Sequence, residues 1–290
     1  MKGFSLLELM LALTVTVLIG MAGFEVFRQN EHTFETQNTV SEAQQNVRAV
    51  IFQINDEIRR AGQGVPVYAG SFDSTATEPL AAVLSGSDST HLRIRDGYSN
   101  AQADVLTAPS SYTLNTMQTL SVSDASSFYN ALNTTTPSGH FAYIWGSGAS
   151  SCWSWVRALI GSIGTANNTI TVTPQQMGQS CLINSTTMQL TSAATIALEE
   201  AVTIDSSAGS IWRQTAADMT IQTSPYWNAS SEIARDIDGL TFTYYDVNDN
   251  VIQPTTLASR LAVVRIDTNV HSQSGFGFNM RGYPVNLRVH

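Results

Sequence analysis

An uninterrupted apolar segment near the N-terminal end sets the strongest limit on how this chain folds. Residues 4–24 are almost wholly apolar, and Glu8 is the one charged residue among them. A helix of this length rises about 31 Å, enough to cross the hydrocarbon layer of a membrane. An ionisable group inside such a span costs about 2.5–3.5 kcal/mol and is interpreted as functional by default. Glu8 is therefore the residue whose position needs a physical reason.

The order of the N-terminal signals differs from that of a secretory signal peptide. In a signal peptide, the cleavage site follows the apolar segment. Here Gly3 precedes that segment. Cleavage after Gly3 would remove only the basic leader, residues 1–3, and would leave the apolar helix on the mature protein with Phe4 as its first residue.

This arrangement resembles the class III prepilins, which comprise type IV pilins, their minor pilins and the pseudopilins of type II secretion. The matching residues are Gly3, Phe4, Ser5, Leu6, Leu7, Glu8 and the apolar segment behind them. The resemblance implies that a prepilin peptidase cuts after Gly3 and methylates Phe4, and that Glu8 pairs with the terminal amine of a neighbouring subunit. Pairing agrees with the physics, because a buried carboxylate is tolerated only when it has a partner. The alternative is a plain membrane anchor with an accidental Glu8.

Helical periodicity continues beyond the apolar segment. After a polar stretch, apolar residues recur in steps of three and four from Val40 to Ile58, which places them on one face of a helix. Arg59 and Arg60 suit the last turn, and Gly62 and Gly64 are stop signals. The pattern predicts one helix of roughly 55 residues, far longer than is usual in globular proteins.

The rest of the sequence predicts strands. Short runs rich in β-branched and aromatic residues alternate with turn residues; they occupy 92–95, 169–173, 240–245 and 261–266. The helix end at 54–62 and the closing strands from Ile237 to His290 look like those of minor pilins of the PilW type. The expected fold is α+β and pilin-like, with the long N-terminal helix packed on an antiparallel sheet and a large β-rich insertion. The expected parts are a leader (1–3), a membrane or filament-core half-helix (4–24), its exposed to half-buried continuation (25–62) and an exported β-rich domain (63–290).

The segment 101–198 differs from its surroundings in charge. Asp104, Asp124 and Arg157 are its only charged residues, while Ser, Thr, Asn and Gly abound. We interpret it either as a loop-rich insertion or as a contact face exposed on a filament. The tryptophans of the chain could pack in the core or stack on a glycan or a partner.

Composition excludes several classes of enzyme. Lys2 is the only lysine, so no P-loop lysine, Schiff-base lysine or Ser-Lys dyad is available to the mature chain. The net charge of −9 disfavours binding to nucleic acid. The histidines are dispersed, and the run from Asp246 to Leu257 lacks the glycine and the carboxylate of a calcium loop, which predicts a hairpin turn at 247–250. We expect no enzymatic activity, no cofactor and no metal site.

Cys152 and Cys181 are the only cysteines. In a chain with an export signature, an even pair predicts one disulfide, which by closing a loop of about 30 residues would stabilise the fold by about 3–4 kcal/mol. Two free thiols, or half of a metal site, are the alternative.

Taken with the resemblance, these features predict a minor pilin of the PilW type that primes assembly of a type IV pilus and enters it, near the tip. The expected partners are the prepilin peptidase, other minor pilins, the major pilin and the inner membrane. The protein would cross that membrane once, with its C-terminal domain in the periplasm, and then reach the cell surface. The alternatives are a J-type pseudopilin of type II secretion and a pilin-anchored adhesin whose ligand is a glycan or another surface.

Overall fold

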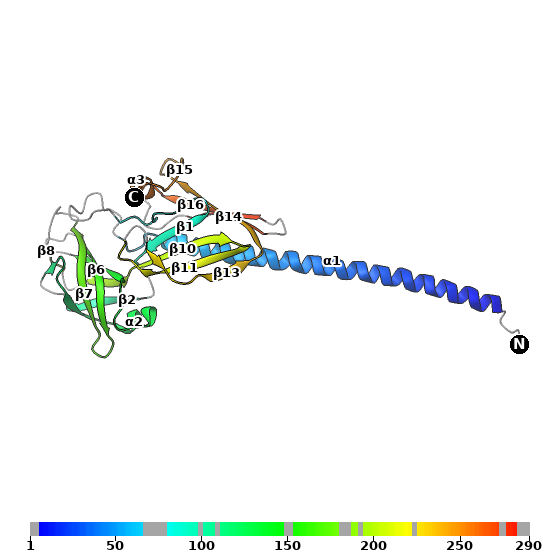
Figure 1. The fold of residues 1–290 in the computed structure, drawn as a ribbon, viewed down its shortest axis with the longest axis horizontal. Coiled ribbons are helices and arrows are strands. Elements are labelled where there is room, and N and C mark those ends of the chain that lie inside the picture. The colour runs from blue at the N-terminus through cyan, green and yellow to red at the C-terminus, as the bar shows by residue number, and fades with distance from the viewer. Residues whose placement is uncertain are drawn as a thin grey trace.

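The computed structural model describes residues 6–65, 80–97, 101–107, 111–147, 153–179, 187–190, 194–221, 225–272 and 277–282. The fold is α+β, with one long helix at the N-terminal end followed by a β-rich region (Figure 1). The first half of the helix extends away from the rest of the molecule, and a closed barrel lies at the opposite end (Figure 1).

The predicted long helix is confirmed as α1 (Leu6–Arg60), which has 55 residues. Its two halves have different surroundings. Every described side chain from Leu6 to Thr39 is exposed, whereas Val47, Ile51 and Ile58 are completely buried. The apolar face predicted for the second half of the helix therefore lies in the core of the protein.

Two glycines end α1 and tie it to the first strand. Gly62 and Gly64 both have positive φ, 75° and 71°, a conformation that suits glycine because it has no Cβ. The Gly62 amide donates to the Arg95 carbonyl at 2.8 Å, and the Gly97 amide donates to the Gln63 carbonyl at 2.7 Å. A Cβ on Gly64 would lie 2.8 Å from the Gly97 oxygen. The close approach at this point fixes the direction in which the helix leaves the sheet.

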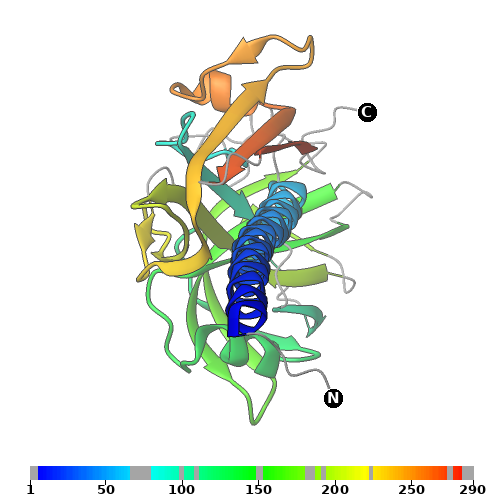
Figure 2. The same cartoon turned by 90° about the vertical axis from the view of Figure 1, so that its right-hand side faces the viewer.

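Two antiparallel sheets share a core with the second half of α1. The first contains β1 (His91–Asp96), β10 (Glu200–Ser207), β11 (Ser210–Asp218), β12 (Tyr226–Trp227) and β13 (Ser231–Arg235). The second, in the order β15-β14-β16-β17, contains β14 (Ile237–Tyr245), β15 (Val251–Ile252), β16 (Arg265–Ser272) and β17 (Gly277–Gly282). Apolar side chains from α1, β1, β10, β14 and β16 form one continuous core. Figure 2, a view along α1, shows the second sheet to one side of the helix.

The barrel interrupts the first sheet in sequence. Its strand order is β2-β4-β7-β6-β5-β9, and the circle is closed because β9 also pairs with β2. The strands are β2 (Gln102–Thr107), β4 (Gln118–Val122), β5 (Phe141–Ser147), β6 (Trp153–Gly164), β7 (Thr169–Gln179) and β9 (Ala194–Leu198). Its interior is filled by apolar side chains, including Ile144, Val156 and Ile196. Beside it lie α2 (Ser126–Leu132) and the short pair β3 (Tyr112–Thr113) and β8 (Thr187–Met188).

The chain leaves the first sheet and returns to it at adjacent points. β1 ends at Asp96, β10 begins at Glu200, and these two residues face each other in the ladder. All strands of the barrel lie between them in sequence. The barrel is thus inserted between two neighbouring strands of another sheet.

Three of the four strand predictions are confirmed, and one is wrong over most of its length. Residues 92–95, 169–173 and 240–245 lie in β1, β7 and β14. Residues 261–264 are not in a strand, because the chain forms the helix α3 (Leu257–Leu261) before β16 begins at Arg265. The Thr256 hydroxyl accepts from the Ser259 amide, and the Ser259 hydroxyl accepts from the Thr256 amide. This reciprocal cap starts a helix that the β-branched run at 261–266 did not indicate.

Candidate functional site

The exposed half of α1 is the most unusual surface of the molecule. Leu6, Phe24 and Phe34 are 79%, 71% and 67% exposed, although each is a large apolar side chain. Contiguous apolar surface of this extent marks a membrane or protein contact. Among the described residues, α1 is the one helix long and apolar enough to cross a membrane. The arrangement is compatible with a single-pass anchor at the N-terminal end.

The threonine hydroxyls in the exposed half are satisfied within the helix. The hydroxyl of Thr16 donates to the Ala12 carbonyl at 2.8 Å, and that of Thr14 donates to the Met10 carbonyl at 3.1 Å. Such bonds allow hydroxyls in an apolar environment, because they leave no donor without a partner. Beyond Phe24, the first charged residue is Glu25, which pairs with Arg28 at 3.1 Å. The change from apolar to charged surface occurs at this turn.

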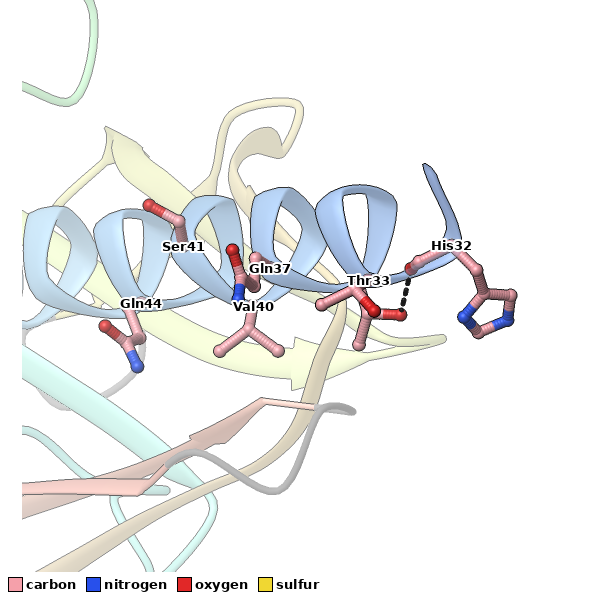
Figure 3. A pocket seen from close by; sticks show the side chains of 7 residues that line it. His32, Thr33, Gln37, Val40, Ser41 and Gln44 are labelled. Atoms are coloured by element: carbon pink, nitrogen blue, oxygen red, sulfur yellow. Dashed lines mark hydrogen bonds between the residues drawn. The ribbon is translucent and has the colours of Figure 1, made fainter. Parts of the chain in front are cut away.

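A shallow recess lies beside α1 where the helix leaves the sheets. It has a volume of about 470 Å³, and its lining comes from His32 to Gln44 of the helix. Figure 3 shows His32, Val40 and Gln44 along this stretch, and the Thr36 hydroxyl donates to the His32 carbonyl at 2.8 Å. The lining side chains carry no carboxylate. The recess marks the transition between the free and the packed halves of the helix.

The predicted site residues fall at the start of α1 and at positions outside the described residues. Glu8 belongs to α1. Gly3, Phe4, Cys152 and Cys181 lie outside the residues that the structure describes. The processing site and the disulfide therefore stay predictions.

The strand ends beside the two cysteines support a test of the disulfide. β6 begins at Trp153 and β7 ends at Gln179, and in this ladder Ser154 faces Gln179. We expect thiol reagents to label neither Cys152 nor Cys181 until a reductant and a denaturant are both present. Mass spectrometry after alkylation measures this. Rapid labelling of both cysteines in the untreated protein would contradict the disulfide.

The predicted turn at 247–250 is confirmed and joins β14 to β15. One Asp246 carboxylate oxygen accepts from the backbone amides of Asn248 and Asn250, at 2.8 and 2.9 Å, and the other accepts from the Asn250 side chain at 3.0 Å. These bonds, first of all the one from the Asn250 side chain, lower the pKa of Asp246. Within the described part of the chain, no three His, Cys, Asp or Glu side chains are grouped so that they could hold a metal ion.

A buried ion cluster joins the barrel to the first sheet. Glu199 lies between β9 and β10, and its two carboxylate oxygens face two arginines from different elements. Arg157 of β6 donates from Nε to Oε2 at 2.6 Å, and Arg95 of β1 places its Nε 3.2 Å from Oε1. All three side chains are at most 4% exposed. We call Glu199, Arg95 and Arg157 the junction cluster.

Neighbouring groups hold the junction cluster in place. The Tyr143 hydroxyl donates to Glu199 Oε1 at 2.8 Å, and Arg157 also donates to the Met219 carbonyl at 3.2 Å. The Arg157 guanidinium stacks on Phe141, 3.7 Å from the ring centroid. Burial, and secondly the charge of Glu199, raise the pKa of Tyr143, so its hydroxyl stays a donor. The cluster therefore fixes the barrel against the sheet through several directed contacts.

A second buried carboxylate fixes α1 itself. Glu57 is 4% exposed and lies on the face of the helix that packs on the first sheet. Its Oε1 is 2.9 Å from Arg213 of β11, and its Oε2 is 3.7 Å from Arg60. Burial raises the pKa of the nearby Glu200, and the negative charge of Glu57 adds to the effect. The free half of α1 is thus continuous with a half that is firmly held.

The junction cluster was not predicted from the sequence. Its three charged members are far apart along the chain, and no local motif connects them. One signal was available: Arg157 is a lone charge in an apolar run of the charge-poor segment, and a charge in a buried strand needs a partner. The identity of that partner depends on the fold.

No protein family model matches the sequence, and no curated protein matches it.

Proposed function

We propose that this protein is a minor pilin of the PilW type, which primes assembly of a type IV pilus and is incorporated near its tip. In this proposal, the prepilin peptidase removes residues 1–3 and methylates Phe4. The exposed half of α1 first holds the protein in the inner membrane, with the β-rich region in the periplasm. It then packs among the corresponding helices of other minor pilins and the major pilin. The expected absence of enzymatic activity is part of this proposal.

The observation that carries the proposal is the division of α1 into two halves. An apolar helix that stays exposed to water is unfavourable, because each Å² of apolar surface left in water forgoes about 25 cal/mol of stabilising free energy. The exposed half must therefore be covered by lipid or by other helices. The second half shares its core with two antiparallel sheets. The exposed half of α1 is therefore joined firmly to the β-rich region.

Features of the exposed half favour contact with helices over lipid alone. Gly20 and Gly23 have no atom within 4 Å of the position that a Cβ would occupy. Small residues on an exposed helix let a neighbouring backbone approach closely, which favours association of helices in a membrane. Gly20, Gly23 and the charge of Glu8 within the apolar span all fit a helix that first lies in lipid and later packs against helices of other subunits.

The processing step supplies a direct test. We expect the wild-type protein to begin with a methylated Phe4, and we expect Gly3→Leu to accumulate uncut in the membrane, because a bulky residue would block the cleavage site. Mass spectrometry of the purified N-terminus measures both. Gly20→Leu is the matched control, since Gly20 lies in the same apolar helix with open space around it, and it should be processed normally. An unmodified Met1 on the wild-type protein would refute the assignment.

The partners separate a pilus from a secretion system. Copurification of the membrane-extracted protein with other minor pilins and the major pilin is the expected result. Copurification with the pseudopilins of a type II secretion system would contradict the pilus assignment and favour a J-type pseudopilin.

A further inference from the structure

Three tryptophans lie side by side on the outer wall of the barrel. In the ladder between β5 and β6, Trp145 faces Trp155, and Trp153 faces Ser147. Trp153 is therefore diagonal to Trp145, a distance that large aromatic side chains span. Their neighbours Ile144 and Val156 point into the barrel, so by alternation all three indoles are on the outside. We call Trp145, Trp153 and Trp155 the tryptophan row.

The row changes from buried to exposed along its length. Trp155 is 6% exposed and packs with Tyr143, Val65 and Leu80, and half-buried Trp145 packs against this group. Trp153 is 59% exposed. The buried end is held firmly, because Tyr143 also donates to Glu199 of the junction cluster. An exposed indole is thus presented on a rigid aromatic base, which reduces the entropy lost when a ligand binds.

The base of the row contains an unused hydrogen-bond donor. The indole Nε1 of Trp155 is buried and has no hydrogen-bond partner among the residues that the structure describes. Buried indole N–H groups normally have a hydrogen-bond partner. A buried donor without one lowers the stability of the fold by about 1–3 kcal/mol. Because this atom is enclosed, a ligand at the surface would contact the exposed indole of Trp153 and not this donor.

The described strands that carry and flank the row, β5, β6 and β7, have no exposed charge. In the described residues of β5, β6 and β7, the only charged side chain is Arg157, which is 3% exposed and paired with Glu199. Phosphates, nucleic acids and acidic peptides would find no countercharge here. An exposed indole in surroundings of this kind suits an uncharged ligand that can stack on it.

The tryptophan row offers enough surface for a small ligand but not for a folded protein. One tryptophan buries at most about 250 Å², whereas a stable protein interface needs about 800 Å² from each partner. A row with one exposed and one half-buried indole is too small to hold a folded protein by itself. A sugar ring matches it, since one face of a pyranose presents C–H groups to an indole while its edge presents hydroxyls.

We propose that the tryptophan row is a binding site for neutral carbohydrate, with Trp153 as the stacking platform. This inference goes beyond the proposed pilin function and does not rest on it, since it involves the barrel and not α1. Because the barrel lies at the end of the molecule opposite to the free half of α1 (Figure 1), the site stays accessible when that half is covered by membrane or helices.

The test uses the full-length protein in a detergent that contains no sugar, since a maltoside headgroup would compete. Tryptophan fluorescence is titrated with cellohexaose, maltohexaose and lacto-N-tetraose, and in parallel with 3′-sialyllactose and a heparin hexasaccharide, each up to about 10 mM. We expect saturable binding of at least one neutral sugar and weaker or no binding of the charged ones. Trp153→Ala should lower the affinity about tenfold or more, as expected for a central aromatic contact.

The matched control is Tyr226→Ala, because Tyr226 of β12 is also 59% exposed but lies in a different sheet. It should bind within about twofold of wild type, and Trp153→Tyr should restore part of the affinity lost in Trp153→Ala. Unchanged far-UV circular dichroism confirms folding of each variant. The proposal is overturned if none of the three neutral sugars binds, if Trp153→Ala binds as well as wild type, or if a charged sugar binds more tightly than the neutral ones.

Discussion

Glu199→Ala is expected to lower the free energy of unfolding by about 3–5 kcal/mol, the cost of breaking a buried ion pair by removing one partner. The change would leave Arg95 and Arg157, both nearly inaccessible to water, without their shared carboxylate. The Tyr143 hydroxyl would lose its acceptor as well. Denaturant unfolding of the full-length protein, followed by tryptophan fluorescence, measures the difference.

Two further variants show whether charge or shape is responsible. Arg235→Ala removes one partner of an exposed pair, Arg235 being 76% exposed and 2.7 Å from Glu232, and should cost less than about 1 kcal/mol. Glu199→Gln keeps the size of the side chain and removes its charge, so it should fall between wild type and Glu199→Ala. A Glu199→Ala protein as stable as Arg235→Ala would show that the junction cluster does not hold the barrel to the sheet.

Glu8→Leu is expected to leave membrane insertion and cleavage after Gly3 intact while it weakens recruitment into the filament. Insertion should improve, because an ionisable group leaves the apolar span. Assembly should suffer, because the terminal amine of a neighbouring subunit would be unpaired among packed helices. Leaving one ion unpaired there costs about 3–5 kcal/mol, which corresponds to about 150-fold to several thousand-fold in an equilibrium constant. Crosslinking and copurification with the other minor pilins are the measurements.

The same helix offers a control for Glu8→Leu. Glu25 is the next acidic residue along α1, and it pairs with Arg28 on the exposed surface. Glu25→Leu makes the same chemical change outside the apolar span, and we expect it to leave recruitment near the wild-type level. If Glu8→Leu forms complexes and pili as well as Glu25→Leu does, Glu8 is not the assembly contact.

Local patterns in the sequence predicted the helix well. The 3.6-residue periodicity from Val40 to Ile58 and the glycines at 62 and 64 indicated both its buried face and its end, and α1 has both. These signals depend on residues within a few turns of each other. The prediction of a strand at 261–266 was wrong over most of its length because the apolar and β-branched residues 261–264 belong to the end of α3 and the turn after it. Val263 in that turn is completely buried, so an apolar side chain is needed there without a strand.

Features formed by distant residues were not predicted. The charge-poor segment indicated strands, but closure of the barrel depends on β9 pairing with both β2 and β5, and these partners are far apart in sequence. The junction cluster and the tryptophan row depend likewise on which strands become neighbours. Trp145 and Trp155 are ten positions apart, and it is the β5–β6 register that places them opposite each other in the ladder.

The insertion point of the barrel has a consequence for how this chain can change. Because Asp96 and Glu200 are paired neighbours, a tight turn could replace residues 97–199 and leave the strand order of the remaining sheet intact. Insertions are tolerated at such points, where the two ends of the added segment lie close together. Removal of the barrel would take Glu199 and Arg157 away, and Arg95 would lose the carboxylate that faces it in the junction cluster. A replacement module must bring its own buried carboxylate, or evolve together with position 95.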